Sequence, residues 1–445
     1  MKPLIHEEII NKNENSQSND ELLILDSFDE PNRADSHLWK KSVERTIFRG
    51  AKTYFILKGK LCLLVGHADK LEPIQIQYPS SIDYRAGTYY DAISELNDQN
   101  CESAQYAVMD LDQSFSQFDI NIKIKYLNVS LPKRPSLPLF VQLEPYAFNL
   151  GINKGKYVED HTGALEALEL LAQHRIQPIK SWISSNQPVD GETTSFINFV
   201  GKHKNGPTNL PDSSKTKEYA KHSTSPWFYV IDEPSENNAS EVQKMLDHLK
   251  EKFPEVKRMV TTDISYPVTG IDIYCPVMDH LYNREEYSGE LWSYVSCMSH
   301  GCGENRSYLD NPSIFDVDQH PRSGVPDLTI DAPNEDIFAF FLIGKHLKLG
   351  ALLYYDSITQ WSLASKGIDI DKDMYNFGGN GDGTLLYPDY INKRARPSLR
   401  LKLIREASYL ADLVTIKNLD LKEKIQSTTD WNINLSIRDE IYKNF

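Results

Sequence analysis

Short, unbroken apolar runs recur along the chain after Pro138, and helical patterns separate them. A run of four to eight apolar residues bounded by turn residues predicts a strand buried on both faces, as in a parallel sheet covered by helices. Such runs span residues 139–146, 176–182, 196–200, 227–231, 259–262, 271–276, 292–296 and 352–355. Apolar residues at helical spacing predict helices that include 164–174, 337–347 and 399–413. Eight strand–helix units over roughly 270 residues predict a (β/α)8 barrel of the TIM type.

The region before Pro138 has an all-β pattern instead. Apolar runs predict short strands at 53–57, 61–65, 74–78 and 106–109. The clearest strand alternates strictly, with one buried and one wet face predicted. Its apolar residues are Ile120, Ile122, Ile124 and Tyr126, and its polar residues are Asn121, Lys123 and Lys125. Several short strands of this kind predict a small β-sandwich.

These patterns divide the 445 residues into four parts. We expect a polar, disordered tail over 1–20, a β-sandwich domain over 21–135, the barrel over 136–415, and a charged helical extension over 416–445. The predicted fold class is therefore α/β, a (β/α)8 barrel preceded by an N-terminal β-sandwich.

The run at 227–231 is the most informative, because Asp232, Glu233 and Pro234 follow it directly. Proline ends a strand, and α/β folds place their chemistry at the carboxyl ends of parallel strands. Acids at such a position often only cap the next helix. Here Ser240 and Gln243 fit a capping box for that helix, so the two acids are not needed as caps. The apolar positions of this predicted helix are Val242, Met245, Leu246, Leu249 and Phe253. The acid pair is therefore a candidate catalytic site.

Composition narrows the classes of partner and compartment. The net charge of −15 argues against nucleic acid or an anionic membrane surface as a partner. No apolar stretch is long enough for a transmembrane segment, and the first 21 residues lack the pattern of a signal peptide. A cytoplasmic location is therefore expected, with export by a non-classical route as the alternative. The five cysteines are few and odd in number, and no disulfide framework is predicted.

Three motifs suggest phosphate or metal binding and fail on their details. A glycine pair in residues 201–206 has phosphate-loop spacing without the lysine that must follow it. Three aspartates in 369–373 imitate a calcium loop without its turn glycine and bidentate glutamate. Two cysteines and a histidine in 297–302 lack a fourth ligand at metal-site spacing. We therefore expect no metal and no cofactor.

Further blocks accompany the acid pair in an order and spacing that resemble a known family. They lie at residues 272–276, 290–294, 380–388 and 398–401. Together with residues 232–234 they resemble the catalytic domain of glycoside hydrolase family 123 and its relatives of unassigned function, the DUF4091 group. The resemblance covers roughly residues 138–413, and its most specific part is the glycine-rich block at 380–388.

The resemblance implies a barrel behind a β-sandwich and retaining β-N-acetylgalactosaminidase chemistry assisted by the substrate's own acetamido group. By that resemblance Glu233 is the general acid/base and Asp232 orients the acetamido nitrogen. Neighbouring strand residues point to opposite sides, so an adjacent pair suits such a division of labour. Repulsion between the two carboxylates is also expected to raise the pKa of one of them, as a general acid requires.

Aromatic side chains are needed to hold a sugar ring and exclude water. The candidates at or just beyond the carboxyl ends of predicted strands are Tyr274, Trp292, Tyr294, Tyr355 and Trp361. Each of them, taken alone, fits the core better than a sugar contact, because barrels are packed with large side chains. Tyr274 and Trp292 are preferred, since the resemblance places aromatic residues there. Asp279, His280 and Asp382 lie on nearby loops and are weaker candidates.

The sequence thus predicts a retaining exo-β-N-acetylhexosaminidase that prefers N-acetylgalactosamine. Its substrate would be a glycan or glycoconjugate with a terminal N-acetylhexosamine. One alternative is a non-catalytic glycan-binding or interaction protein on a glycosidase scaffold, since an arginine usual in the family is absent from residues 336–340. A third reading keeps the enzyme but assigns a sugar without an acetamide and another acid as nucleophile.

Overall fold

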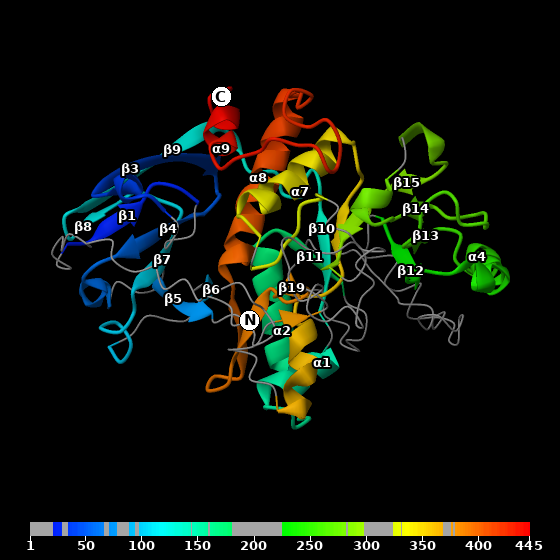
Figure 1. The fold of residues 1–445 in the computed structure, drawn as a ribbon, viewed down its shortest axis with the longest axis horizontal. Helices are drawn as coiled ribbons and strands as arrows, with labels where there is room; N and C mark the ends of the chain where they lie inside the picture. The colour runs from blue at the N-terminus through cyan, green and yellow to red at the C-terminus, as the bar shows by residue number, and fades with distance from the viewer. Residues whose placement is uncertain are drawn as a thin grey trace, which may run out of the picture.

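The computed structural model describes residues 21–28, 34–65, 71–77, 89–93, 98–143, 145–158, 161–179, 225–281, 284–297, 324–330, 332–367, 375–376 and 379–445. Within these residues the fold is mixed α/β, with N-terminal sheets, parallel strands further along the chain, and helices packed against both (Figure 1). The predicted tail at 1–20 lies outside the described residues, as do the motifs at 201–206 and 369–373 and most of the cluster at 297–302.

The N-terminal region contains two sheets. The first has the order β2-β1-β4-β7-β5-β6, and its paired neighbours are antiparallel. Its strands are β1 Leu23–Leu25, β2 Trp39–Lys40, β4 Thr53–Lys58, β5 Leu71–Gln77, β6 Tyr89–Ile93 and β7 Tyr106–Leu111. The second sheet consists of β3 Ser42–Arg49, β8 Phe115–Gln117 and β9 Ile120–Ser130. Arg45 of β3 lies over the ring of Phe55 of β4, so side chains of the two sheets are in contact.

The alternation predicted for β9 holds over its first half. Ile120, Ile122 and Ile124 are buried, and the residues between them are exposed. Tyr126 was expected on the buried face, and this expectation is wrong, because its side chain is 46% exposed and Leu127 is buried instead. The pairing of β3 with β9 shifts register beyond Tyr126, and such an irregularity reverses which residues face the core.

The strand predicted at 61–65 is also wrong. Residues Leu61–Leu64 form the 3-10 helix η2, in which the first and last residues are buried and the two between them are exposed. A three-residue repeat of buried positions suits a 3-10 turn rather than a strand.

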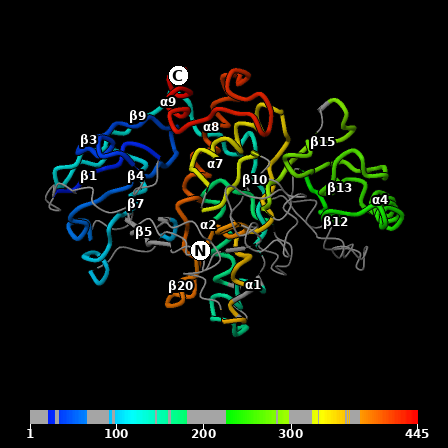
Figure 2. The backbone as a smooth tube through the Cα atoms, in the orientation of Figure 1, coloured from blue at the N-terminus to red at the C-terminus, as the bar shows by residue number. Residues whose placement is uncertain are grey.

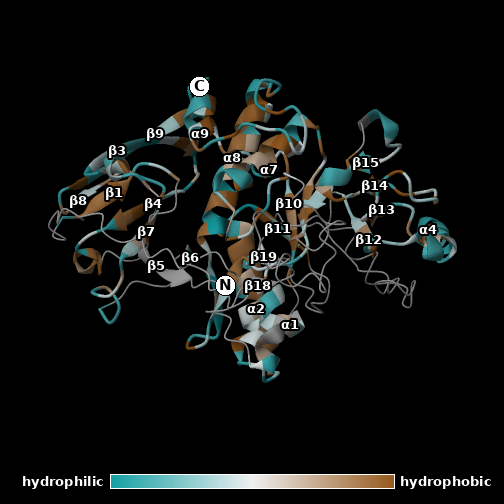
Figure 3. Cartoon of the chain, viewed as in Figure 1, coloured by the Kyte–Doolittle hydropathy of each residue, from teal (hydrophilic) through white to brown (hydrophobic). Residues whose placement is uncertain are grey.

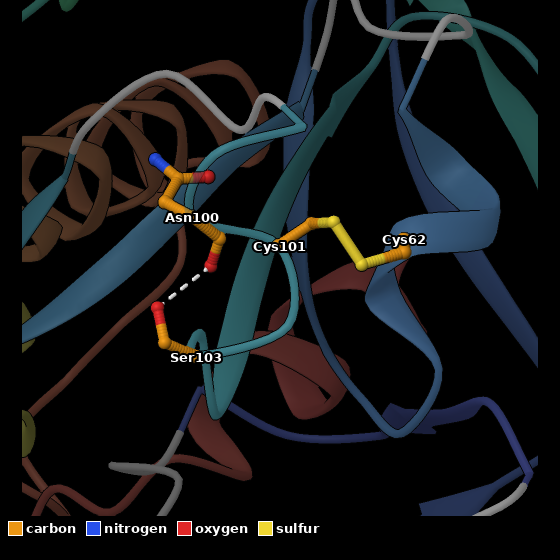
Figure 4. The surroundings of a disulfide bond; sticks show 4 residues. All are labelled: Cys62, Asn100, Cys101 and Ser103. Carbon is orange, nitrogen blue, oxygen red and sulfur yellow. Dashed lines mark hydrogen bonds between the residues drawn. A yellow bond between two sulfur atoms is a disulfide. The ribbon is translucent and has the colours of Figure 1, made fainter.

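A disulfide joins Cys62 of η2 to Cys101 in the turn before β7 (Figure 4). This pair was not predicted. An odd number of cysteines argues against a complete disulfide framework, but it is compatible with an isolated bridge. Cys297 is disulfide-bonded as well, and Cys275 is a buried free thiol. The cytoplasmic location is not tested by this structure and stays a prediction.

Two four-stranded parallel sheets follow. One has the order β11-β10-β17-β16 and the other the order β12-β13-β14-β15. Their strands are β10 Leu139–Gln142, β11 Ile176–Ile179, β12 Trp227–Ile231, β13 Lys257–Val260, β14 Ile273–Tyr274, β15 Glu290–Leu291, β16 Ser293–Val295 and β17 Leu352–Tyr354. Every strand predicted after Pro138 has a counterpart here except 196–200, which lies outside the described residues.

The two parallel sheets are joined by the segment that contains β15 and β16. Its first half pairs with β14, its second half pairs with β17, and a bridge connects Val277 with Tyr294. One separate apolar cluster draws side chains from both sheets. Its members are Phe140, Ile179, Trp227, Tyr229, Met259, Ile273, Cys275, Val277, Trp292, Tyr294, Ala351 and Leu353. An interior filled in this way is what a barrel requires, but closure between β11 and β12 falls on 180–224, outside the described residues, so the barrel stays a prediction.

Helices cover the strands. They are α1 Pro145–Ile152, α2 His161–Gln173, α4 Ala239–Lys252, α7 Glu335–His346, α8 Leu399–Lys417 and α9 Ile437–Tyr442. The apolar positions predicted for α4 are all buried, and the rest of that helix is mostly hydrophilic (Figure 3). The predicted capping box is wrong, because the 3-10 helix η3 Glu236–Asn238 leads directly into α4, and Gln243 bonds Asp247 instead.

Helix α8 runs between the N-terminal strands and α7 (Figures 1 and 2). It contacts β4, β6 and α7, and all its residues from Leu399 to Val414 are buried. The extension at 416–445 was expected to be helical, but beyond α8 it forms turns and only the short helix α9. Arg438 of α9 donates to the backbone oxygen of Thr46 in β3, so the extension packs on the second of the two N-terminal sheets.

The remaining elements are short. They are the 3-10 helices η1 Ser36–Leu38, η4 Met278–His280, η5 Arg284–Glu286 and η6 Thr359–Lys366, and the strands β18 Tyr375–Asn376, β19 Gly379–Asn380, β20 Leu386–Asp389 and β21 Arg394–Pro397.

Candidate active site

The acid pair leaves the carboxyl end of β12, all five residues of which are buried. Asp232 and Glu233 are half-buried, so both carboxyl groups keep some access to solvent. The pairing of β12 with β13 shifts register between Tyr229 and Ile231, directly before the acids. Such irregularities redirect the side chains that follow, and they are frequent beside active sites.

Two hydroxyl groups hold Asp232. Tyr229 Oη donates to Asp232 Oδ1 at 2.5 Å, and Thr261 Oγ1 donates to the same oxygen at 2.9 Å. Burial and the adjacent Asp232 carboxylate raise the pKa of Tyr229 well above its usual value, so the phenol keeps its proton and remains a donor. Thr261 directly follows β13, so the carboxyl ends of two neighbouring strands converge on this carboxylate.

Glu233 is held by separate contacts. Its backbone φ is +40°, in the left-handed region that residues other than glycine rarely adopt. Its N–H donates to Thr261 Oγ1 at 2.6 Å, which stabilises this conformation. Tyr294 Oη, on β16, donates to Glu233 Oε1 at 2.5 Å. The two adjacent acids therefore take hydrogen bonds from different tyrosines on different sheets.

Tyr229 and Thr261 were not singled out from the sequence. Tyr229 reads as one more apolar residue of a buried strand, and Thr261 as an ordinary strand end. One sequence signal could have found Thr261. This residue lies at the end of the predicted strand that follows the acid-bearing strand in the chain, and the carboxyl ends of neighbouring parallel strands share one edge of a sheet.

The floor beneath the acids is apolar. Cys275 is fully buried just beyond β14, and burial, together with the charge of Asp232, raises the pKa of its thiol well above the usual value. A thiol in this state is not a nucleophile. Cys275 therefore contributes apolar packing near Asp232 and no chemistry of its own.

Among the predicted aromatic contacts, only Tyr294 has a hydrogen bond to one of the acids in the described structure. Trp292 is buried deeper, where its ring stacks on Phe140 and its Nε1 donates to Glu290 at 2.7 Å. Glu290 pairs with Lys257, and both residues begin their strands, so Trp292 faces the amino ends of the sheet and not the acids.

Tyr274 and Trp361 are also buried. The ring of Tyr274 packs edge-on against Tyr287, with ring centroids 5.4 Å apart. Trp361 is fully buried in η6, and its Nε1 donates to the backbone oxygen of Leu386 at 3.0 Å. These contacts place Trp361 in the core between η6 and β20. Its role as a sugar contact has no support from its position.

Asp279 and Tyr355 lie nearer the expected mouth. Asp279 is half-buried in η4, two residues after Val277, which bridges to Tyr294. One of its carboxylate oxygens is buried without a hydrogen-bond partner among the described residues. Tyr355 directly follows β17 and is half-buried. Both residues therefore occupy the carboxyl edge of the parallel strands, the same edge as the acids.

Asp382, a weaker candidate from the sequence, is at the centre of a buried cluster. Its Oδ1 accepts from Tyr354 Oη, and its Oδ2 accepts from Tyr355 Oη and the backbone N–H of Cys297, each at 3.1 Å. Burial outweighs these donors and raises the pKa of Asp382 to about 7. Asp382 thus connects the glycine-rich loop, residues 379–384, to the ends of β16 and β17.

Neither a metal site nor a membrane helix emerges from the described part of the chain. No three His, Cys, Asp or Glu residues within it group closely enough to hold a metal ion. None of its helices combines the length and apolar character needed to cross a bilayer.

No protein-family model matches the chain, and no curated protein sequence matches it. Among solved structures, the fold is similar to that of a family 123 glycoside hydrolase from Clostridium perfringens, which was described in a study of glycolipid glycan hydrolysis. The match has a TM-score of 0.48 and 11% sequence identity, and it covers 95% of this chain and 91% of that one.

Proposed function

We propose that this protein is a retaining exo-β-N-acetylhexosaminidase in which Asp232 and Glu233 divide the catalytic work. The observation that carries the proposal is the pair of separate hydrogen-bond sets, with Tyr229 and Thr261 on Asp232 and Tyr294 on Glu233. Adjacent carboxylates held in this way suit two different tasks on one substrate. A preference for N-acetylgalactosamine follows only from the family resemblance.

In the first step Glu233, protonated, donates its proton to the glycosidic oxygen, and the bond from that oxygen to the anomeric carbon breaks. The carbonyl oxygen of the substrate's own acetamido group attacks the anomeric carbon from the opposite face and forms a cyclic oxazolinium ion. Asp232 accepts a hydrogen bond from the acetamido N–H and stabilises the positive charge that develops there. The protein itself supplies no nucleophile.

In the second step the Glu233 carboxylate removes a proton from water, and the water oxygen attacks the anomeric carbon. The oxazolinium ring opens, the acetamide is regenerated, and Glu233 is protonated again. Two inversions give net retention at the anomeric carbon. Tyr294 holds Glu233 in place through both steps, so that the same carboxyl group acts first as acid and then as base.

The proposal includes the closed (β/α)8 barrel. In such a barrel all carboxyl ends lie on one face, where substrates bind. Asp279 and Tyr355, at that face, are the proposed sugar contacts.

The test compares hydrolysis of an aryl β-N-acetylgalactosaminide with that of the matching N-acetylglucosaminide by wild type, Glu233→Gln and Asp232→Asn. We expect each variant to lose at least about a hundredfold in kcat while it folds normally, as the loss of a general acid or of transition-state stabilisation requires. A substrate whose aryl leaving group departs without protonation does not need the general acid. It should therefore restore the rate of the first step in Glu233→Gln but not in Asp232→Asn.

Three outcomes would separate the alternatives. Full activity in both variants would overturn the proposal. Binding of acetamido sugars without turnover by wild type would support the glycan-binding alternative. Turnover that a thiazoline analogue of the cyclic intermediate does not inhibit would indicate another acid as nucleophile.

A further inference from the structure

The N-terminal sheet reaches the glycine-rich loop through one buried ion pair. Asp91 lies in β6, the edge strand of the first sheet, and its neighbour Ala92 forms a bridge with Ser398 at the start of α8. Ser398 caps that helix by accepting from the backbone N–H of Leu401. Asp91 is thereby held beside the first turn of α8.

Arg400, in that first turn, uses all of its side-chain N–H groups. Nε and Nη2 donate to Asp91, while Nη1 donates to the backbone oxygens of Leu328 at 2.7 Å and Gly381 at 2.9 Å. Nη2 also donates to the backbone oxygen of Thr384 at 2.6 Å. A guanidinium has five such donors in a fixed plane, so its position fixes the backbone it contacts.

The loop at 379–384 packs closely against this arginine. Gly381 has φ +77°, and a Cβ there would lie 2.8 Å from Arg400 Nη2. Tyr387 Oη, further along the chain, donates to Asp91 Oδ2 at 2.7 Å. Asp91 therefore holds both Arg400 and the strand that follows the loop.

In the sequence Asp382 lies between Gly381 and Thr384, two of the three residues whose backbone oxygens accept from Arg400. Asp382 in turn accepts from Tyr355. Tyr355 follows β17, whose Leu353 pairs with Tyr294 of β16. Tyr354, the last residue of β17, pairs with Val295 of β16 and also donates to Asp382, so the residues around Asp382 contact the strand that carries Tyr294. The contacts thus run without a gap from the N-terminal sheet to the edge that carries the acids.

We propose that Asp91 is a positioning residue of the active site, which acts through Arg400 to hold the glycine-rich loop, Asp382 and Tyr355 in their substrate-binding geometry. The N-terminal sheet is then part of the catalytic apparatus and not an attached binding domain. The catalytic half of this inference rests on the proposed glycosidase function, but the structural half does not.

The chain offers a matched control. Asp110 of β7 forms the same kind of buried ion pair with α8, through Arg405 and Lys402, but no contact of Asp110 in the described residues reaches the loop. Asp91→Asn and Asp110→Asn each remove one carboxylate charge from the same sheet–helix interface. Tyr387→Phe is a milder second variant, since it loosens Asp91 and leaves its charge.

The first readout is hydrogen exchange of the amides at 379–386, which needs no substrate. We expect faster exchange in Asp91→Asn and Tyr387→Phe and wild-type exchange in Asp110→Asn. Equal exchange in all three variants would overturn the coupling, whatever the protein's activity. If Asp91→Asn does not fold, the comparison of exchange rates between Tyr387→Phe and Asp110→Asn tests the coupling.

The second readout is steady-state kinetics on the aryl glycoside. We expect KM to rise about tenfold in Asp91→Asn with little change in kcat, the size of effect that residues coupled to a site produce. Asp110→Asn should leave both constants unchanged. A loosened loop with unchanged KM would overturn the role at the site, whereas an inactive wild type would contradict only the proposed function.

Discussion

Tyr294 Oη lies 2.5 Å from Glu233 Oε1, and this hydrogen bond joins the two parallel sheets. Glu233 follows β12 in one sheet, and Tyr294 lies in β16 of the other. The bond crosses the interior at the edge where the acids stand. The position of the proposed acid/base therefore depends on both sheets.

Tyr294→Phe removes the hydroxyl that makes this bond. We expect kcat to fall about tenfold to a hundredfold, because Glu233 loses the donor that orients it for proton transfer. The measurement is steady-state hydrolysis of the aryl glycoside. Tyr266→Phe, which removes a 2.8 Å bond to Asn238 in the core, is the matched control and should leave kcat unchanged. A parallel loss in the control would mean that the effect is one of folding.

Thr261 is the second test, because its hydroxyl serves both acids. Thr261→Val removes the donor to Asp232 and leaves the Glu233 N–H without its acceptor, so the free energy of unfolding should fall by about 1–3 kcal/mol along with the activity. Thr261→Ser keeps the hydroxyl and should retain most of both. Denaturant unfolding and kinetics measure the two effects; equal losses in the two variants would point to packing of the methyl group instead.

The Cys62–Cys101 disulfide closes a loop between residues 39 positions apart. Ser103 Oγ donates to the backbone oxygen of Asn100, which shapes the turn that carries Cys101 (Figure 4). The double substitution of both cysteines by serine should lower the free energy of unfolding by about 2–4 kcal/mol, because the unfolded chain regains the freedom of this loop. Urea unfolding tests this, and an unchanged midpoint would show that the bond contributes nothing.

Asp382 predicts a pH dependence of stability. Its pKa of about 7 lies above that of an unfolded aspartate, near 4, so between these values the folded state holds a proton that the unfolded state has released. Its contribution to stability is full below about pH 4 and is lost as the pH rises to about 7, with a slope near 1.4 kcal/mol per pH unit. Asp382→Asn should remove that slope.

The measurement is the difference in the free energy of unfolding between Asp382→Asn and wild type at several pH values. The variant should gain on wild type as the pH rises from 4 to 7. Glu406 and Asp412, whose pKa values burial also raises, contribute equally to both proteins and cancel in this difference. A difference that does not change with pH would contradict the raised pKa of Asp382.

Local patterns in the sequence determined the strands and the place of the acids. The buried runs predicted β10, β12 and β17, and the apolar spacing predicted the buried face of α4, because burial of one strand or one helix face follows a fixed period. Asp232 and Glu233 were recognised because an abrupt end of a buried strand is itself a local feature.

Helix α8 shows where local patterns fail. It carries Arg400, Lys402, Arg405 and Glu406 within a few residues, yet all are buried. Asp91 and Asp110, which pair with the three basic residues, lie about 300 positions earlier in the chain (309 positions from Arg400 to Asp91). Burial of the three basic residues is stable because the first N-terminal sheet supplies the opposite charges, and no period along the helix records that.

The tertiary structure alone also decided which side chains serve the acids. Tyr294 was predicted as a sugar contact together with Trp292, which faces away, whereas Tyr229 was not distinguished from the other apolar residues of its buried strand. The direction of each side chain depends on the register between strands far apart in the chain. The sequence by itself therefore determined the two carboxylates, whereas the donors that hold them follow from strand pairing, because hydrogen-bond geometry depends on distances that only the packed sheets set.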